Sequence, residues 1–242
     1  MSTASRFRIV AVACLFLAAA PTQSFATPVT FNALSGNLAA SATFDTSGND
    51  LIVTLTNTSP DDVLVPADIL TALFFDITNA VALSKSSAAL APGSIVLFGG
   101  TDPLNVVGGE WAYRTGLVGA PHSSSYGIGS AGFGLFGDAD RFPGSNLQGP
   151  NAPNGLQYGI TSMGDDPGTG NGPVTGPNAL IQNSVIFTFG GLPAGFDPSS
   201  SISNVSFQYG TSLAEPNIET PEPRTFLLLV MGLALTIHRR HA

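Results

Sequence analysis

Alternation of apolar and polar residues over short runs limits what this chain can fold into. Over residues 50–57 the sequence reads DLIVTLTN, so Leu51, Val53 and Leu55 fall on one side of an extended chain. Successive side chains of a strand point to opposite faces, so a period of two is typical of a strand with one buried face. Residues 50–57 are therefore predicted to form a strand whose aliphatic side faces a core.

Similar strand signals recur along the chain. Residues 184–189 and 203–209 alternate in the same way, and Leu70–Thr78 is apolar on both faces, which is typical of a central strand. Further strands are predicted at 94–98 and 110–114. The turn residues Ser-Gly-Asn-Asp ahead of the first run predict a hairpin with the segment before it.

Residues 27–214 show no strong helical period, so the predicted fold class is all-β. Short strands separated by Gly and Pro turns favour a single antiparallel β-sandwich domain, and a β-barrel closed on itself is the alternative. Residues 99–176 hold 20 of the 28 glycines and are predicted to be long loops interrupted by short strands. The alternating segments of about ten residues that an outer-membrane barrel needs are missing there. Residues 215–220 are predicted to be a polar linker.

The first 26 residues carry the parts of a secretory signal peptide. Arg6 and Arg8 give a positive start, and Ile9–Ala20 is an apolar run of 12 residues. Small residues then occupy the positions that signal peptidase reads, so cleavage is expected after Ala26. Cys14 would be a lipoprotein cysteine in an alternative interpretation, but the residues before it form a poor lipidation motif.

Three features follow one another in residues 221–242. The segment begins with a rigid, charged tripeptide made of Pro221, Glu222 and Pro223. An uncharged run of 13 residues comes next, and an arginine pair made of Arg239 and Arg240 closes it. The apolar residues of this run are Phe226, Leu227, Leu228, Leu229, Val230, Met231, Gly232, Leu233, Ala234, Leu235 and Ile237.

The run from Thr225 to Ile237 is predicted to be a transmembrane helix about 20 Å long, short for a hydrocarbon core of about 30 Å. Its lack of charge favours insertion, and the arginine pair would act as a stop-transfer signal that stays in the cytoplasm. The two prolines keep the chain before the membrane extended. A buried helix of the globular domain is the alternative, although such a helix would show a polar face.

The order of these parts resembles the PEP-CTERM sorting signal of exosortase-dependent surface proteins. The resemblance implies that exosortase, a membrane-embedded transpeptidase-like protease of Gram-negative bacteria, recognises the tail and removes it. It also implies a precursor held by one pass in the inner membrane and a mature form at the cell surface or in the extracellular matrix. Only two arginines follow the run here, where many relatives carry more. Segments of the body that also look like this family are TLTNT at 54–58, LFFDI at 73–77, GEWAYR at 109–114, RFPGSN at 141–146 and VSFQYG at 205–210.

The predicted mature body, residues 27–220, is acidic and contains no cysteine. It holds 15 acidic residues and three basic side chains, so its formal net charge is 3 − 15 = −12. A surface of that charge repels nucleic acid, which we do not expect as a partner. Without cysteine the body forms no disulfide and no thiolate metal site.

Two sets of side chains are candidates for ligand binding. Carboxylates in loops would supply the oxygen ligands that Ca²⁺ prefers, which makes it the one candidate cofactor. These metal candidates are Asp138, Asp140, Asp165 and Asp166. They lack the spacing of a calcium-binding loop, and the other interpretation is that they form turns and solvate loops. The aromatic candidates for stacking on sugars, unless they belong to the core, are Trp111, Tyr113, Tyr126 and Tyr158.

No catalytic residue is identified in the sequence. The string Gly127-Ile-Gly-Ser-Ala-Gly132 fits a dinucleotide-binding pattern, but no strand and helix surround it. His122 precedes three serines without a nucleophile motif, so a surface histidine is expected. The expected function is a non-enzymatic surface or matrix protein associated with exopolysaccharide in a biofilm. The alternatives are a lectin-like carbohydrate-binding module, with or without calcium, and a secreted hydrolase that uses carboxylates.

Overall fold

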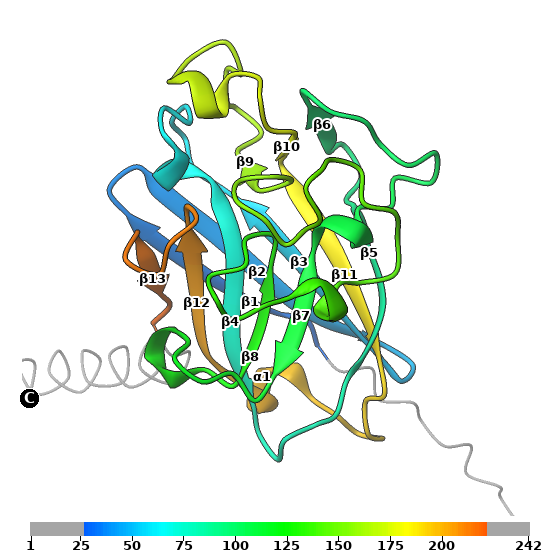
Figure 1. The fold of residues 1–242 in the computed structure, drawn as a ribbon. Coiled ribbons are helices and arrows are strands. Elements are labelled where there is room, and N and C mark those ends of the chain that lie inside the picture. The colour runs from blue at the N-terminus through cyan, green and yellow to red at the C-terminus, as the bar shows by residue number, and fades with distance from the viewer. Residues whose placement is uncertain (1–26, 222–242) are drawn as a thin grey trace, which may run out of the picture.

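Two β-sheets make up the part of the chain that the computed structural model describes, residues 27–221 (Figure 1). One sheet has five strands and the other has eight. The prediction of an all-β fold is confirmed. The predicted signal peptide and the sorting segment from Glu222 onward lie outside the described residues.

The five-stranded sheet has the order β1-β2-β3-β11-β5, and all its pairs are antiparallel. Its strands are β1 (Val29–Ser35), β2 (Leu38–Ser47), β3 (Asp50–Asn57), β5 (Ser84–Leu90) and β11 (Ser184–Gly190). The predicted hairpin is β2 and β3, joined at Gly48, whose φ of 62° a residue without a side chain adopts readily. Leu51, Val53 and Leu55 are fully buried, as the alternation predicted.

The eight-stranded sheet is built around β4 (Leu70–Ile77), which pairs with β12, β8 and β9. Its other strands are β6 (Ile95–Leu97), β7 (Ala112–Thr115), β8 (Tyr126–Gly129), β9 (Ile160–Thr161), β10 (Leu180–Gln182), β12 (Ile202–Tyr209) and β13 (Asn217–Glu219). The prediction of a purely antiparallel fold is wrong at one place, because β9 and β10 pair in parallel. The reason is that a long loop of the glycine-rich region connects β9 to β10, where a hairpin would have made the two strands antiparallel.

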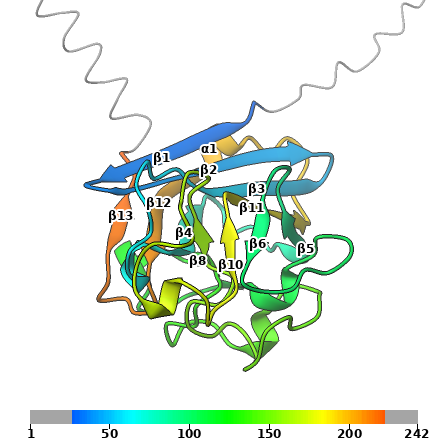
Figure 2. The ribbon, with the colours of Figure 1, turned by 90° about the horizontal axis from the view of Figure 1, so that it is seen from above.

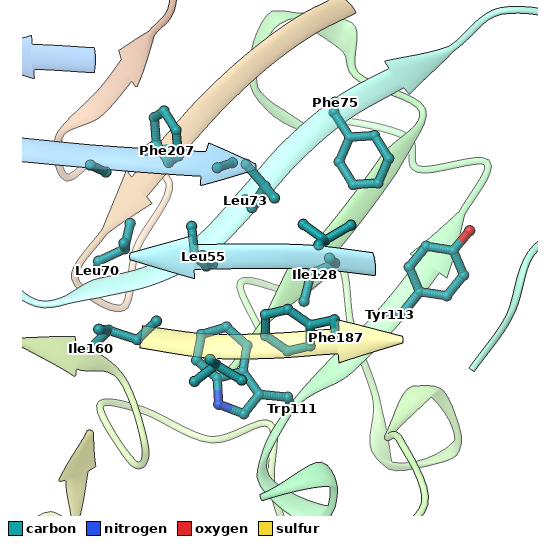
Figure 3. Packing of buried hydrophobic residues seen from close by; sticks show 14 of the residues in the cluster. Leu55, Leu70, Leu73, Phe75, Trp111, Tyr113, Ile128, Ile160, Phe187 and Phe207 are labelled. Atoms are coloured by element: carbon teal, nitrogen blue, oxygen red, sulfur yellow. The ribbon is translucent and has the colours of Figure 1, made fainter. Parts of the chain in front are cut away.

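The main core lies between the two sheets and is made by their facing side chains (Figure 3). Phe44 of β2 and Phe75 of β4 meet edge to face, with ring centroids 5.2 Å apart. Trp111 contacts Phe187 of β11 with centroids 5.1 Å apart. Edge-to-face pairs of this kind add to the stabilisation that comes from burying the rings. The two sheets therefore pack face to face in a sandwich-like arrangement (Figure 2).

A second apolar cluster covers the opposite face of β4, which explains why this strand is apolar on both sides. Phe74 of β4 stacks on Phe136, which comes from the glycine-rich region. Gly129 of β8 makes room for that ring, because a Cβ at this position would lie 2.8 Å from it. Part of the glycine content thus serves close packing of loops on the sheet.

Helices are short in the described residues. α1 (Pro198–Ser201) is the α-helix, and the 3₁₀ turns are Pro66–Asp68, Gly108–Glu110, Pro121–Ser123, Asp138–Asp140 and Gly172–Val174. Within residues 27–221, no helix combines the length and the apolar character that crossing a bilayer requires. The strand predicted at 110–114 starts at Ala112 instead, because Glu110 belongs to a 3₁₀ turn.

Candidate functional site

The C-terminal end of the described chain is tied into the eight-stranded sheet by β13. Residues 215–220, expected as a linker, include this strand, which pairs with β12 from Ser206 opposite Glu219 to Gln208 opposite Asn217. Thr220 continues the pairing and is buried, whereas Pro221 is exposed. The described sheet therefore ends at the residue directly before the predicted sorting motif.

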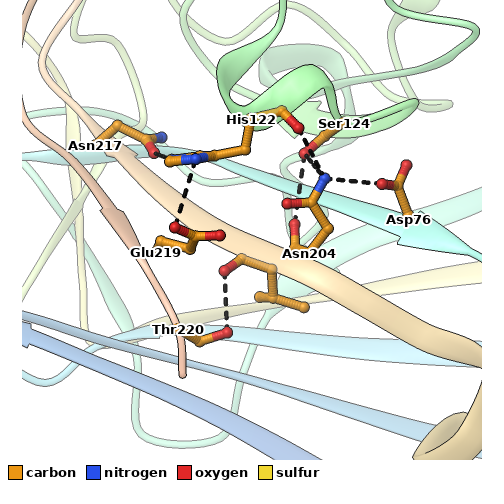
Figure 4. A network of polar contacts seen from close by, with 8 residues as sticks. Asp76, His122, Ser124, Asn204, Asn217, Glu219 and Thr220 are labelled. Atoms are coloured by element: carbon orange, nitrogen blue, oxygen red, sulfur yellow. Dashed lines mark hydrogen bonds and ion pairs between the residues drawn. The ribbon is translucent and has the colours of Figure 1, made fainter. Parts of the chain in front are cut away.

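His122 contacts two residues of β13 through its two ring nitrogens (Figure 4). Its Nε2 lies 2.9 Å from Oδ1 of Asn217, and its Nδ1 lies 3.5 Å from Oε2 of Glu219. A protonated imidazole ring donates from both nitrogens, so that form satisfies both contacts at once. The expected surface histidine is thus exposed and bridges a loop to the last described strand.

The turn that carries His122 is held by Asn204 of β12. The Nδ2 of Asn204 donates to Oδ2 of Asp76 at 2.8 Å, to the carbonyl oxygen of His122 at 3.1 Å and to Oγ of Ser124 at 3.1 Å. Asp76 also accepts a hydrogen bond from the amide of Ser125 at 2.7 Å. β4, β12 and the turn at Pro121–Ser123 therefore position the histidine together.

An open groove of about 600 Å³ lies where the chain leaves the fold. Glu219 and Pro221 line it from one side, and Ala33, Leu34 and Pro60 are among its other lining residues. Leu34 has 71% of its surface exposed, so this edge of β1 offers an apolar side chain to the solvent. The groove therefore adjoins Pro221, the first residue of the predicted sorting motif.

The acidic candidates for a metal site are engaged in other contacts. Asp138 forms an ion pair of 2.5 Å with Arg141, and Asp140 accepts a hydrogen bond from the amide of Gly137 at 2.9 Å. Arg114 also approaches Asp140 at 4.0 Å. These two carboxylates stabilise a 3₁₀ turn and the arginines beside it.

Asp165 and Asp166 are placed beside Asp62, a proximity that the sequence did not reveal. Asp165 is buried and accepts a hydrogen bond from the amide of Val63 at 2.8 Å, and burial raises the pKa of its carboxyl. The amide of Asp166 donates to Oδ1 of Asp62 at 3.0 Å. In the described residues, no group of three or more His, Cys, Asp or Glu side chains is arranged to hold a metal ion.

The four aromatic candidates for sugar stacking belong to the core. Trp111 and Tyr158 have no exposed surface, and Tyr113 and Tyr126 are buried as well. Burial raises the pKa of the Tyr158 phenol to about 12. Of the two interpretations left open by the sequence, burial supports the core, because a sugar ring cannot reach these side chains.

The glycine string that fits a dinucleotide pattern also has a structural role. Gly127 and Gly129 lie in β8, which pairs with β4 and β7. A dinucleotide site of that kind needs a helix whose N-terminus faces the phosphates. The residues after β8 in this chain instead form a turn that leads into the loop over β4.

Glu110 is a fully buried carboxylate that sequence reasoning passed over. Its Oε1 accepts hydrogen bonds from the amides of Leu147 and Gln148, and its Oε2 has no hydrogen-bond partner within residues 27–221. Burial raises the pKa of this carboxyl, and the two amides and Arg141 offset the rise only in part. Its single visible signal was a lone acid next to the one tryptophan. Glu110 fixes the loop after Arg141 against the core.

No protein-family model matches this chain, and neither curated proteins nor solved structures gave a match.

Proposed function

We propose that this chain is the precursor of an exported surface or matrix protein of a Gram-negative bacterium. Signal peptidase removes residues 1–26 during export, and the tail at 221–242 holds the body outside the inner membrane. Exosortase then recognises Pro221, Glu222 and Pro223 and cleaves the tail. The body carries no enzymatic activity in this proposal and is released to the cell surface or the extracellular polysaccharide.

The observation that carries the proposal is the position at which the chain leaves the fold. All described strands of both sheets lie within residues 27–220, and the buried Thr220 is followed by the exposed Pro221. Cleavage at this point would remove none of the strands that the structure describes. This separation supports a signal that is cut off after use.

The spacing between the fold and the apolar run supports the same function. Five residues, 221–225, separate Thr220 from Phe226, and an extended chain of that length spans about 17 Å. The body would therefore stand close to the membrane surface until cleavage. A protease embedded in that membrane would find the Pro-Glu-Pro motif within its reach.

The composition of the body is consistent with an extracellular role. Its net charge of −12 favours solubility, and its lack of cysteine makes folding independent of disulfide formation. The candidate carboxylates for a hydrolase or a calcium-dependent lectin bind arginines and backbone amides instead. No observation favours either alternative over the proposed function.

Mass spectrometry of the mature C-terminus tests the proposal. The protein is purified from the producing bacterium and from the same strain without its exosortase gene. The tail is expected to be missing in the first sample and intact in the second. An intact tail in both samples would overturn the proposal.

A motif variant sharpens this test. Replacing Pro221, Glu222 and Pro223 by Ala, Gln and Ala should leave the tail attached in the presence of exosortase. Pro103→Ala, which removes an exposed proline elsewhere, is the matched control and should be processed normally. Normal processing of the motif variant would assign recognition to some other part of the chain.

A further inference from the structure

The outer face of the five-stranded sheet carries side chains that neither the core nor the sorting signal uses. The inward residues of β1, β2 and β3 belong to the main core, so the alternate residues point away from it. We call two rows of uncharged polar residues within this outward set the threonine face; the outward apolar residues Leu34 of β1 and Ile52 of β3 lie beside these rows. The threonine face consists of Thr30, Asn32, Ser41, Thr43, Thr54 and Thr56.

The register of the strands arranges these residues in two rows. Thr30 lies opposite Thr43, which lies opposite Thr54. Neighbouring strands are about 4.8 Å apart, and alternate residues of one strand are about 6.8 Å apart. Hydroxyl groups therefore repeat on this face with two fixed spacings.

The hydroxyl groups of the face are held in place rather than free to rotate widely. Threonine is branched at Cβ and has few preferred χ1 rotamers in a strand. The hydroxyls of Thr30 and Thr43 are also bonded to each other at 2.8 Å. An array of this kind is preorganised for a ligand that makes many hydrogen bonds at once.

The threonine face stays accessible in the described part of the molecule. Figure 2 shows this sheet along one side, while the second sheet and the described loops lie on its other side. Thr30 and Asn32 are exposed, and the other four residues are half-exposed. Among the described residues, none from outside these strands forms a hydrogen bond with these side chains, so their hydroxyls and amide are available to a ligand.

Charge decides which class of ligand fits this face. The two rows carry no charged residue, and the nearest outward charges, Asp45 and Asp50, lie toward the hairpin end. The body around the face has a net charge of −12, which repels anionic polymers and second copies of the same chain. Trp, Tyr and Arg, which dominate most protein interfaces, are absent from the six residues. The class of ligand that these observations leave is a neutral, hydroxyl-rich one.

Resting on the export to an extracellular matrix proposed above, we infer that the threonine face binds a neutral, linear polysaccharide whose chains lie along the sheet. Each hydrogen bond to such a ligand is weak on its own in water. Affinity therefore comes from several hydroxyls acting together, so a polymer is retained where a short sugar is not. In this inference the threonine face binds the sugar by hydrogen bonds, because the buried aromatic rings cannot stack on it.

Co-sedimentation of the full chain in detergent with insoluble glycans tests this inference. The glycans are cellulose, curdlan and the deproteinised extracellular polysaccharide of the producing cells. The wild-type protein should sediment with at least one of them, with little dependence on salt, and should not be competed by cellobiose. It should not bind alginate, an anionic polymer. Failure to sediment with all three glycans would overturn the inference.

Isosteric variants assign the binding to the face. Thr43→Val and Thr54→Val remove the hydroxyl but keep the branched shape, so the fold is retained. Each should weaken retention about three- to tenfold, and the double variant more. Thr115→Val, on the exposed end of β7, and Thr211→Val are the matched controls and should bind like the wild type. Equal weakening by a control variant would contradict the assignment.

Two further outcomes would show that the threonine face binds something other than a polysaccharide. Dimers in sedimentation velocity that Thr54→Lys abolishes would assign it to a second copy of the chain. A change in ice growth that the valine variants abolish would assign it to a water lattice. Either result, without glycan retention, overturns the inference. The state of the tail in mass spectrometry does not enter these readouts, so a failure here leaves the sorting proposal intact.

Discussion

Thr220 donates two hydrogen bonds to the carbonyl oxygen of Val205, one from its amide at 2.9 Å and one from its hydroxyl at 3.0 Å. These bonds are the last contacts of the sheet before Pro221. They fix the end of the described sheet next to the predicted sorting motif.

Thr220→Val should therefore loosen the end of the sheet. Valine keeps the shape but removes the hydroxyl donor, so the free energy of unfolding should fall by about 1 kcal/mol. Urea unfolding followed by circular dichroism measures the change. Thr211→Val, at an exposed position, is the control and should stay within about 0.5 kcal/mol of the wild type. Equal stability of both variants would show that the hydroxyl bond contributes nothing.

His122→Ala should increase the opening of β13 without unfolding the body. It removes the contacts to Asn217 and Glu219, and exposed pairs of this kind contribute at most about 1 kcal/mol. Hydrogen exchange at the amide of Thr220 should become up to about fivefold faster, while amides of β3 should be unchanged. His122→Gln keeps one donor toward Asn217 and should fall in between. Unchanged exchange at Thr220 in the alanine variant would contradict the bridging role.

Gly129→Ala should destabilise the protein by about 1–3 kcal/mol. The added methyl group would lie 2.8 Å from the Phe136 ring, which packs on Phe74. Phe136→Leu in the same chain should recover part of the loss, because the smaller side chain leaves space. Thermal unfolding of the two single variants and the double variant measures the coupling. Purely additive losses would mean that the ring and the glycine do not depend on each other.

Glu110 should give the stability of the wild type a specific pH dependence. Burial raises the pKa of its carboxyl above the ordinary value, so the folded state binds the proton more tightly than the unfolded state. Its contribution to stability is therefore greatest below the unfolded pKa of about 4.3 and is lost as pH rises through the raised pKa.

Glu110→Gln removes this titration. The wild type should lose stability relative to the variant as pH rises from about 4 to 7. Urea unfolding at several pH values measures the difference between the two curves. Asp61→Asn, on an exposed carboxyl, serves as the control and should run parallel to the wild type. Parallel curves for Glu110→Gln would show that the buried carboxyl has an ordinary pKa in the folded protein.

Regular strands were predictable because their alternation is a local signal. The period of two located β3, β11 and β12, and the apolar run at 70–78 located the central strand β4. Which strands pair was not predictable, because the partners of β3 are β2 at a tight turn and β11 more than a hundred residues later. Nothing local in either strand records that second pairing.

The candidate site was predictable only in part for a similar reason. Pro221 was found from its motif, but β13 was missed because three paired residues within a polar segment look like a linker. Trp111 and Tyr158 were ambiguous, since an aromatic residue in the glycine-rich region looks the same in sequence whether it stacks on a ligand or fills a core. Glu110 was missed because burial of a charged residue depends on loops that fold over it.

The pairing of β3 with β11 has a consequence for the order of events in the cell. Val53 of β3 lies opposite Phe187 of β11. The five-stranded sheet therefore cannot form until the chain has been made as far as β11. Folds dominated by contacts between distant segments generally collapse into their final form slowly. For the export proposed above, a newly made chain that folds slowly would pass a narrow translocation channel unfolded and assemble its sheets on the far side.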